Sequence, residues 1–171
     1  MTEHVLALPA AHTVLAVDAH LIPTGAFDDV RAKPWLDFNL PKPIGRDIAN
    51  GTVAPGGGYD NAWIYDEWTP GGEPQLRAEV SSPLSGIRMQ VLTDQPSLQF
   101  YSGNFLDGTL PKKKDQGGGT YVHWGALALE AQLFPDAVHH QGEARWPSVV
   151  LRAGETYRQQ TAYRFTMPRA P

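Results

Sequence analysis

Apolar and polar residues alternate with a two-residue period in several short segments of the chain, a pattern that predicts β-strands. The clearest segment is 87–93, and after a turn at 94–97 a second strand is expected at 98–102, so the two together predict a hairpin. Weaker runs of the same kind cover His4–Leu8, Val14–Val17, Asn61–Tyr65, Ala78–Val80 and Tyr157–Phe165. Seven or eight short strands predict an all-β, antiparallel sandwich or barrel.

The segment from Gly125 to Leu133 is ambiguous between helix and strand. Its Ala, Leu and Glu residues favour a helix by intrinsic propensity. Its alternation favours a strand that turns Leu127 and Leu129 toward the core and Glu130 to the opposite face. We predict the strand, although periodicity alone does not decide so short an apolar run.

Long polar loops rich in glycine and proline separate the predicted strands. The chain of 171 residues has 17 Gly and 15 Pro, which leaves little room for long helices. Long loops on a rigid sheet are where binding and catalytic sites are commonly built. No internal repeat or shift in composition marks a boundary, so we predict a single domain over residues 1–171. The loops in question are 41–59, 66–75, 104–120 and 135–147.

Charge and composition exclude several classes of protein. Lys and Arg number 14 against 18 Asp and Glu, a formal charge of −4, so we expect no nucleic-acid partner. Because the chain has no cysteine, it has no disulfide and no cysteine nucleophile. No stretch approaches the roughly 20 apolar residues of a membrane span, and the apolar segment 5–17 is broken by Pro9 and His12, unlike a secretory signal. We therefore predict a cytoplasmic protein with no membrane partner.

Glu130 is the most informative polar residue, because it stands between Leu129 and Ala131 in an apolar run. A partly desolvated carboxylate has a raised pKa, and a strand would fix its position, as a general base requires. The alternative is an ordinary glutamate on the wet face of an edge strand. The pattern leaves both interpretations open.

Three further polar residues are candidates for binding a sugar. Gln99 and Tyr101 share one face of their predicted strand and could present an amide and a phenol to a ligand, although ordinary cross-strand polarity explains them too. Asp60 follows three glycines and precedes Trp63, which could place a carboxylate beside an aromatic platform. A glycine-rich turn that ends in aspartate is the alternative.

Other kinds of chemistry have little support in the sequence. The adjacent histidines at 139–140 would point to opposite faces of a strand, and no carboxylate stands at a familiar ligand spacing, so we predict no metal site. No Gly-Lys-Ser/Thr follows the glycines at 56–58, so a phosphate loop is not predicted. The Gly-x-Ser-x-Gly motif of serine hydrolases is also absent from the sequence.

Several short motifs, each weak alone, resemble those of one family in the same order along nearly the whole chain. That family is the aldose 1-epimerases, also called galactose mutarotases. The motifs are Leu21–Gly25, Leu36–Phe38 with Pro43–Gly45, Gly58–Asn61, Ser85–Gly86, Gln99–Gly108, Leu129–Asp136 and Leu151–Tyr157.

The resemblance implies a large β-sandwich that interconverts the α and β anomers of free hexoses such as galactose or glucose. It implies no metal or organic cofactor. Carried over by matching motifs, Glu130 would be the base that takes the proton of the C1 hydroxyl, Asp60 would bind sugar hydroxyls, and Gln99 would lie beside the substrate.

The departures from the family are as informative as the matches. The chain corresponds only to the C-terminal half of the family sequence, and it lacks the Asn-His motif whose histidine protonates the ring oxygen. His4 and His123 are weak substitutes for that acid. We therefore expect either a homodimer or a complex with a separate N-terminal half, because half a sandwich exposes sheet edges and apolar surface. The alternative function is a non-catalytic carbohydrate-binding β-sandwich.

Overall fold

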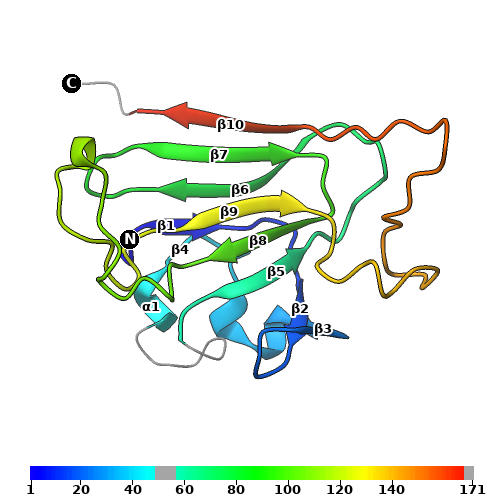
Figure 1. Ribbon diagram of the computed structural model, residues 1–171, viewed down its shortest axis with the longest axis horizontal. Helices are drawn as coiled ribbons and strands as arrows, with labels where there is room; N and C mark the ends of the chain where they lie inside the picture. Colours follow the sequence, from blue (N-terminus) through cyan, green and yellow to red (C-terminus); the bar gives the residue numbers. More distant parts are fainter. Residues whose placement is uncertain (49–56, 168–171) are drawn as a thin grey trace.

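The computed structural model describes residues 1–48 and 57–167, which form two five-stranded antiparallel sheets packed face to face (Figure 1). The predicted all-β sandwich is therefore confirmed. The first sheet has the order β10-β7-β6-β1-β4, and its strands are β1 (Val5–Ala7), β4 (Lys42–Pro43), β6 (Gln75–Ser81), β7 (Arg88–Thr93) and β10 (Thr161–Thr166). The second has the order β3-β2-β5-β8-β9, and its strands are β2 (Thr13–Val17), β3 (Pro23–Asp29), β5 (Asp60–Ile64), β8 (Ser97–Tyr101) and β9 (Ala128–Gln132).

Helical structure in the described part of the chain is limited to single turns. They are α1 (Gly45–Ile48) and three short 3₁₀ helices at Val30–Ala32, Pro34–Leu36 and Lys114–Gln116. None of these turns has the length or the apolar character that crossing a membrane would require.

The main core lies between the two sheets and is built around aromatic rings. Phe38, Tyr59, Trp63 and Phe100 are all fully buried, and the Tyr59 and Phe100 rings stack with their centroids 5.2 Å apart. Aliphatic side chains from both sheets complete this cluster: Leu6, Leu8, Val14, Ala78, Val80, Val91, Leu98 and Leu129. Burial of this apolar surface holds the sheets together.

A second, smaller cluster covers part of the outer face of the second sheet. Leu15, Ala62 and Ile64 project from that face, and the loop after β9 packs Phe134 and Trp146 against them. The outer face is thus apolar and covered at one end of β5, whereas Asp60 begins the strand at its other end.

The predicted hairpin between 87–93 and 98–102 is wrong, although both strands exist. β7 pairs with β6 and β10 in the first sheet, whereas β8 pairs with β5 and β9 in the second. The link between them crosses from sheet to sheet and is buried at Asp94 and Gln95. The Asp94 carbonyl accepts a hydrogen bond from Trp68 Nε1 at 2.8 Å. This connection is therefore held by a residue distant in the sequence and is not a tight turn closed on itself.

The strand predicted at the ambiguous segment is confirmed as β9, and its alternation is as expected, with Leu129 buried and Glu130 exposed. β3 was not predicted, since Pro23–Asp29 contains a proline and a glycine and no regular alternation. β4 lies within residues 41–59, where a loop was predicted.

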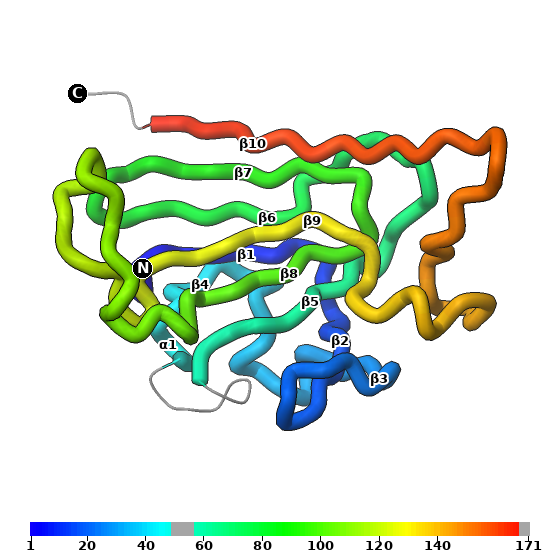
Figure 2. The backbone as a smooth tube through the Cα atoms, in the orientation of Figure 1, coloured from blue at the N-terminus to red at the C-terminus, as the bar shows by residue number. Residues whose placement is uncertain are grey.

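β10 and β9 are free edge strands of the first and second sheets, and in the view of Figure 2 β7 and β6 lie between them. Few bonds join them. Gln159 Nε2 donates to the Ala131 carbonyl at 3.2 Å, and the Tyr163 hydroxyl donates to the Leu129 carbonyl at 3.4 Å. These two backbone carbonyls on the open edge of β9 therefore accept hydrogen bonds from side chains and not from a neighbouring strand.

Candidate active site

Strand register brings Asp60, Gln99 and Glu130 to the outer face of the second sheet. Gln99 on β8 is the direct partner of Ala62 on β5 and of Glu130 on β9. Directly paired residues project from the same face of a sheet, and so does Asp60, two residues before Ala62. Residues 39 and 31 positions from Gln99 in the sequence therefore become its neighbours in space.

Gln99 also links β8 to β5 by a side-chain hydrogen bond. Its Nε2 donates a hydrogen bond of 2.8 Å to Asp60 Oδ1. Its Oε1 is buried and has no hydrogen-bond partner in the described part of the chain. Gln99 also helps to line a small cavity of about 80 Å³, together with Leu15, Val17, Leu21, Pro23, Asp60, Ala62 and Pro135. A hydroxyl group that entered this space would supply the missing donor to Gln99.

Glu130 stands on the other side of Gln99 from Asp60. Two strand spacings, about 10 Å, separate β9 from β5. The Glu130 side chain is exposed and makes no hydrogen bond or ion pair with the described residues, because β9 is the edge strand of its sheet. Glu130 is therefore on an edge strand, as one interpretation of the sequence expects. It also borders the polar site, as the other interpretation requires.

Asp60 is positioned by a clamp on the residue before it. Ser102 Oγ accepts a hydrogen bond of 2.8 Å from the Tyr59 backbone N–H, and Asn104 Nδ2 donates to the Tyr59 carbonyl at 3.0 Å. Ser102 Oγ also donates to Asn104 Oδ1 at 2.5 Å, so the two side chains act as one unit. All three residues are buried. This clamp fixes where β5 starts and hence where the Asp60 carboxylate lies.

Gly58 makes the clamp possible. Its φ is +77°, in the left-handed region that favours glycine, and a Cβ there would lie 2.0 Å from Asn104 Oδ1 and 2.6 Å from Ser102 Oγ. The glycine-rich turn thus has a steric role beside the site. Ser102 and Asn104 were not predicted as positioning residues, although both lie in the Gln99–Gly108 motif.

Tyr101 shares the face of Gln99 and is the register partner of Asp60. Its hydroxyl accepts a 2.9 Å hydrogen bond from the Phe105 backbone N–H, and its ring stacks on the Phe105 ring. The structure therefore places Tyr101 beside the site while tying its hydroxyl to the loop that follows β8.

None of the six histidines is hydrogen-bonded to Asp60, Gln99 or Glu130 among the described residues. His139 bonds to Asp136, and His140 bonds to Glu143 at 2.9 Å. In the described part of the chain no group of three or more His, Asp and Glu side chains is arranged to hold a metal ion.

The sequence profile described as aldose 1-epimerase matches residues 1–164. The chain belongs to the aldose 1-epimerase family. Among its relatives, galactose mutarotase of Rattus norvegicus is 35% identical over 158 residues, which is 92% of this chain. Aldose 1-epimerase of Escherichia coli (strain K12) is 35% identical over 156 residues, 91% of this chain.

Solved structures of the family agree with the fold. A GalM/aldose epimerase homologue from C. elegans superimposes with a TM-score of 0.73 at 27% identity, covering 97% of this chain and 46% of that one. Galactose 1-epimerase from Lactobacillus acidophilus NCFM gives a TM-score of 0.58 at 26% identity, covering 78% and 36%. This aldose 1-epimerase family chain spans only 42% of the rat relative's length and 43% of the bacterial one's.

Proposed function

We propose that the chain carries the base side of an aldose 1-epimerase active site and that the complete site interconverts the anomers of free hexoses such as galactose or glucose. The observation that carries the proposal is the row of Asp60, Gln99 and Glu130 across three neighbouring strands. The names of the relatives, which are epimerases or mutarotases, support the same chemistry and disfavour a purely binding module.

The proposed reaction needs proton transfers and a bond rotation only. Glu130 takes the proton of the C1 hydroxyl while an acid protonates the ring oxygen, so the bond between C1 and the ring oxygen breaks and an open-chain aldehyde forms. Rotation about C1–C2 presents the other face of the aldehyde, and the reverse proton transfers close the ring as the second anomer. No step uses a metal or an organic cofactor.

Asp60 and Gln99 hold the sugar in this proposal. Asp60 accepts hydrogen bonds from hydroxyl groups, and the unpartnered Oε1 of Gln99 accepts another. Their mutual bond keeps both side chains fixed before the sugar arrives, which lowers the entropic cost of binding. Tyr101 forms a wall of the site, because its own hydroxyl is tied to Phe105.

The acid comes from family sequence outside these 171 residues, on the same polypeptide or on a second one. We propose that this complementary part docks along the free edges of β9 and β10. Tyr163 and Phe165 are the register partners of Val91 and Met89, so they point to the core side of the first sheet, yet they are 51% and 63% exposed. Added strands there would cover those rings and bring new side chains close to Glu130.

A second copy of this chain is the other partner expected from the sequence. It would add a second base and would not supply the family's Asn-His motif. We therefore favour the complementary part over the homodimer. The cytoplasmic location expected from the lack of cysteine stays a prediction.

Polarimetry of freshly dissolved α-D-galactose tests the function. We expect the chain together with the complementary part to speed the approach to the anomeric equilibrium, and the chain alone to match the rate in buffer. Size-exclusion chromatography with light scattering establishes which assembly is present. A stable assembly that binds galactose without changing its relaxation rate would contradict the enzyme and favour the carbohydrate-binding alternative.

A further inference from the structure

A second, larger cavity opens on the same outer face of the second sheet, at the opposite end of β5 from Asp60. Its volume is about 420 Å³, and it is lined by Thr13, Ile64, Tyr65, Asp66, Trp68, Pro96, Phe134, Ala144 and Arg145. Ile64 is four residues beyond Asp60, which places the two ends of the strand about 13 Å apart. The cavity lies within the size range of small-molecule sites, about 300 to 1,000 Å³.

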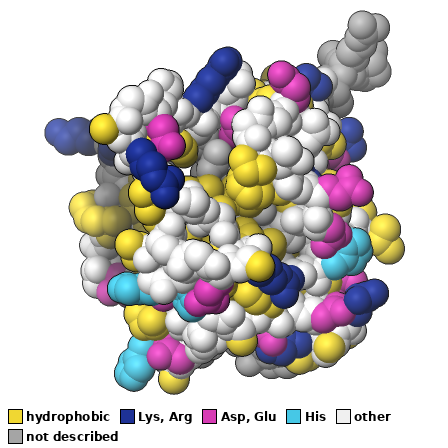
Figure 3. All heavy atoms as spheres, turned by 90° about the vertical axis from the view of Figure 1, so that its right-hand side faces the viewer, with side chains coloured by type: hydrophobic (Ala, Val, Ile, Leu, Met, Phe, Trp, Pro, Cys, Tyr) yellow, Lys and Arg dark blue, Asp and Glu magenta, His cyan; other side chains and the backbone are white. Residues whose placement is uncertain are grey.

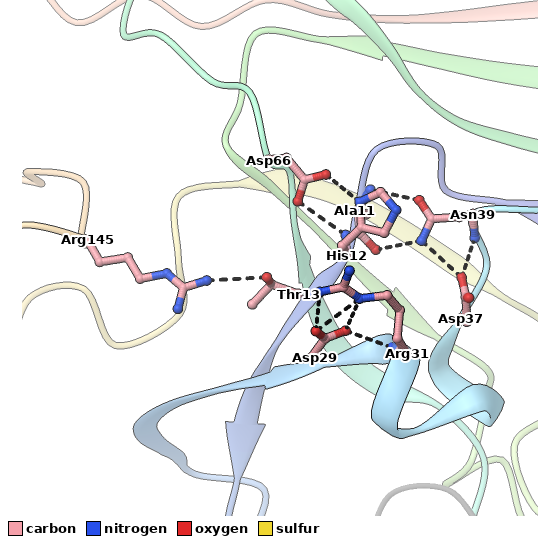
Figure 4. A network of polar contacts seen from close by, with 9 residues as sticks. All are labelled: Ala11, His12, Thr13, Asp29, Arg31, Asp37, Asn39, Asp66 and Arg145. Carbon is pink, nitrogen blue, oxygen red and sulfur yellow. Dashed lines mark hydrogen bonds and ion pairs between the residues drawn. The ribbon is translucent and has the colours of Figure 1, made fainter.

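Arg145 brings a positive charge without a carboxylate partner to this cavity. Its guanidinium lies 3.8 Å from the centroid of the Phe27 ring and donates a 3.3 Å hydrogen bond to Thr13 Oγ1 (Figure 4). Within residues 1–48 and 57–167 no carboxylate lies within ion-pair distance of it, unlike Arg31, which is paired with Asp29. A guanidinium has five N–H donors, so Arg145 is held in place and keeps donors for a ligand.

Asp66 brings a fixed acceptor to the same cavity. Its Oδ2 lies 2.5 Å from His12 Nδ1, and its Oδ1 accepts a long 3.4 Å bond from the His12 backbone N–H. The side chain stays 38% exposed. A carboxylate has about four acceptor positions, so Asp66 can still accept hydrogen bonds from a ligand.

Trp68 supplies an aromatic wall that cannot swing freely. Its Nε1 donates to the Asp94 carbonyl at 2.8 Å, which fixes the ring, and the side chain is only partly buried. The end of the molecule shown in Figure 3 mixes acidic, basic and histidine side chains with apolar ones, so no single sign of charge dominates there.

We propose that this cavity is a second saccharide-binding site, separate from the Asp60 and Gln99 site. A neutral pyranose can donate hydroxyl hydrogens to Asp66, accept hydrogen bonds from Arg145, and place its C–H face against Trp68. An anion would meet the Asp66 carboxylate, and a cation would meet Arg145, so a neutral polyol fits the lining better than either. The proposal does not depend on catalysis at the first site.

Fluorine NMR of the protein labelled with 5-fluorotryptophan tests this site directly. The chain has five tryptophans, and the Trp68 resonance is assigned by its loss in Trp68→Phe. We expect methyl β-D-galactopyranoside, whose anomeric centre is locked, to shift the Trp68 resonance saturably. The shift should persist in Asp60→Ala, which disables the first site. Inorganic phosphate at the same concentrations should leave the resonance unmoved.

Arg145→Met supplies the matched change, because it keeps an unbranched side chain against Phe27 and removes the N–H donors. We expect affinity for the glycoside to fall about tenfold to a hundredfold, as loss of hydrogen bonds from a charged group predicts. Arg152→Met, an exposed arginine outside the lining, is the control and should bind normally.

Three outcomes would overturn the proposal. They are a Trp68 resonance that does not respond to the glycoside, a response to phosphate in its place, or equal affinity in Arg145→Met and the unaltered protein. Unchanged resonances of the other four tryptophans establish that each variant is folded.

Discussion

At the residue scale, Gln99 lies between the two carboxylates of the candidate active site, as the register partner of Glu130 and a hydrogen-bond donor to Asp60. Its amide nitrogen is satisfied by Asp60, whereas its carbonyl oxygen is buried without a donor in the described part of the chain. An unsatisfied buried polar atom costs about 1 to 3 kcal/mol. A bound hydroxyl would remove that penalty, so the penalty favours binding.

Gln99→Ala tests this role. We expect the affinity of the assembled protein for galactose to fall about tenfold or more, because the variant loses the acceptor and frees Asp60 to move. Gln132→Ala is the matched control, since Gln132 lies on the same face of β9 and its side chain makes no hydrogen bond to described residues. Isothermal titration calorimetry measures both, and equal affinities would show that Gln99 does not contact the sugar.

Gly58→Ala tests the clamp that positions Asp60. We expect it to lower the free energy of unfolding by about 2 to 4 kcal/mol, because the new Cβ collides with Asn104 and Ser102 and adds left-handed strain. Gly71→Ala separates the strain of the left-handed backbone from the collision, since Gly71 has a similar φ of +72° and open space around it. Urea denaturation compares them. Equal losses in the two variants would mean that the clamp contributes nothing.

At the scale of elements, the sequence predicts strands better than it predicts their partners. Alternation correctly identifies β8 and β9, because one face of each is buried. It cannot show that the segment after β7 crosses to the other sheet, since that depends on Trp68 and Gln160 bonding to Asp94 from distant parts of the chain. The same limit applies to Ser102 and Asn104, whose role appears only when β8 lies beside β5.

His4, the residue before β1, gives a prediction about pH. Burial lowers the pKa of His4 below its usual value of 6.5. The unfolded chain therefore binds a proton at this residue more readily than the folded chain, so stability falls as the pH drops below about 6.5. His4→Gln should lose less stability than the unaltered protein between pH 7.5 and 5, as followed by urea denaturation.

His20→Gln is the control for that series, because His20 is exposed in the turn after β2. The stability of His20→Gln should fall with decreasing pH as much as the stability of the unaltered protein does. If His4→Gln and the unaltered protein had parallel pH profiles, the burial of His4 would have no part in the loss of stability at low pH.

At the scale of the whole molecule, the chain is a sandwich whose two sheets both end in open edges on one side. The exposed rings of Tyr163 and Phe165 on β10 lie at the edge where we propose that the complementary part docks. The residues chosen from family motifs converge on the outer face of the second sheet, whereas the free edges of β9 and β10 could not be predicted without the strand order.

Phe165→Arg tests the docking edge. We expect the affinity between the chain and the complementary part to fall at least tenfold, as for an aromatic residue buried at an interface. The isolated chain should keep its stability, because Phe165 is already 63% exposed. Leu84→Arg is the control, since Leu84 is 97% exposed in the turn between β6 and β7. Equal affinities in the two variants would place the interface elsewhere.

The most direct test of the proposed mechanism is the rate of α-D-galactose mutarotation by the assembled protein carrying Glu130→Gln. The amide keeps the shape of the side chain and removes its basic oxygen. We predict that kcat falls about a hundredfold to ten-thousandfold, as expected for loss of a general base, while galactose affinity changes much less. Near-normal turnover in Glu130→Gln would contradict the assignment of Glu130 as the base.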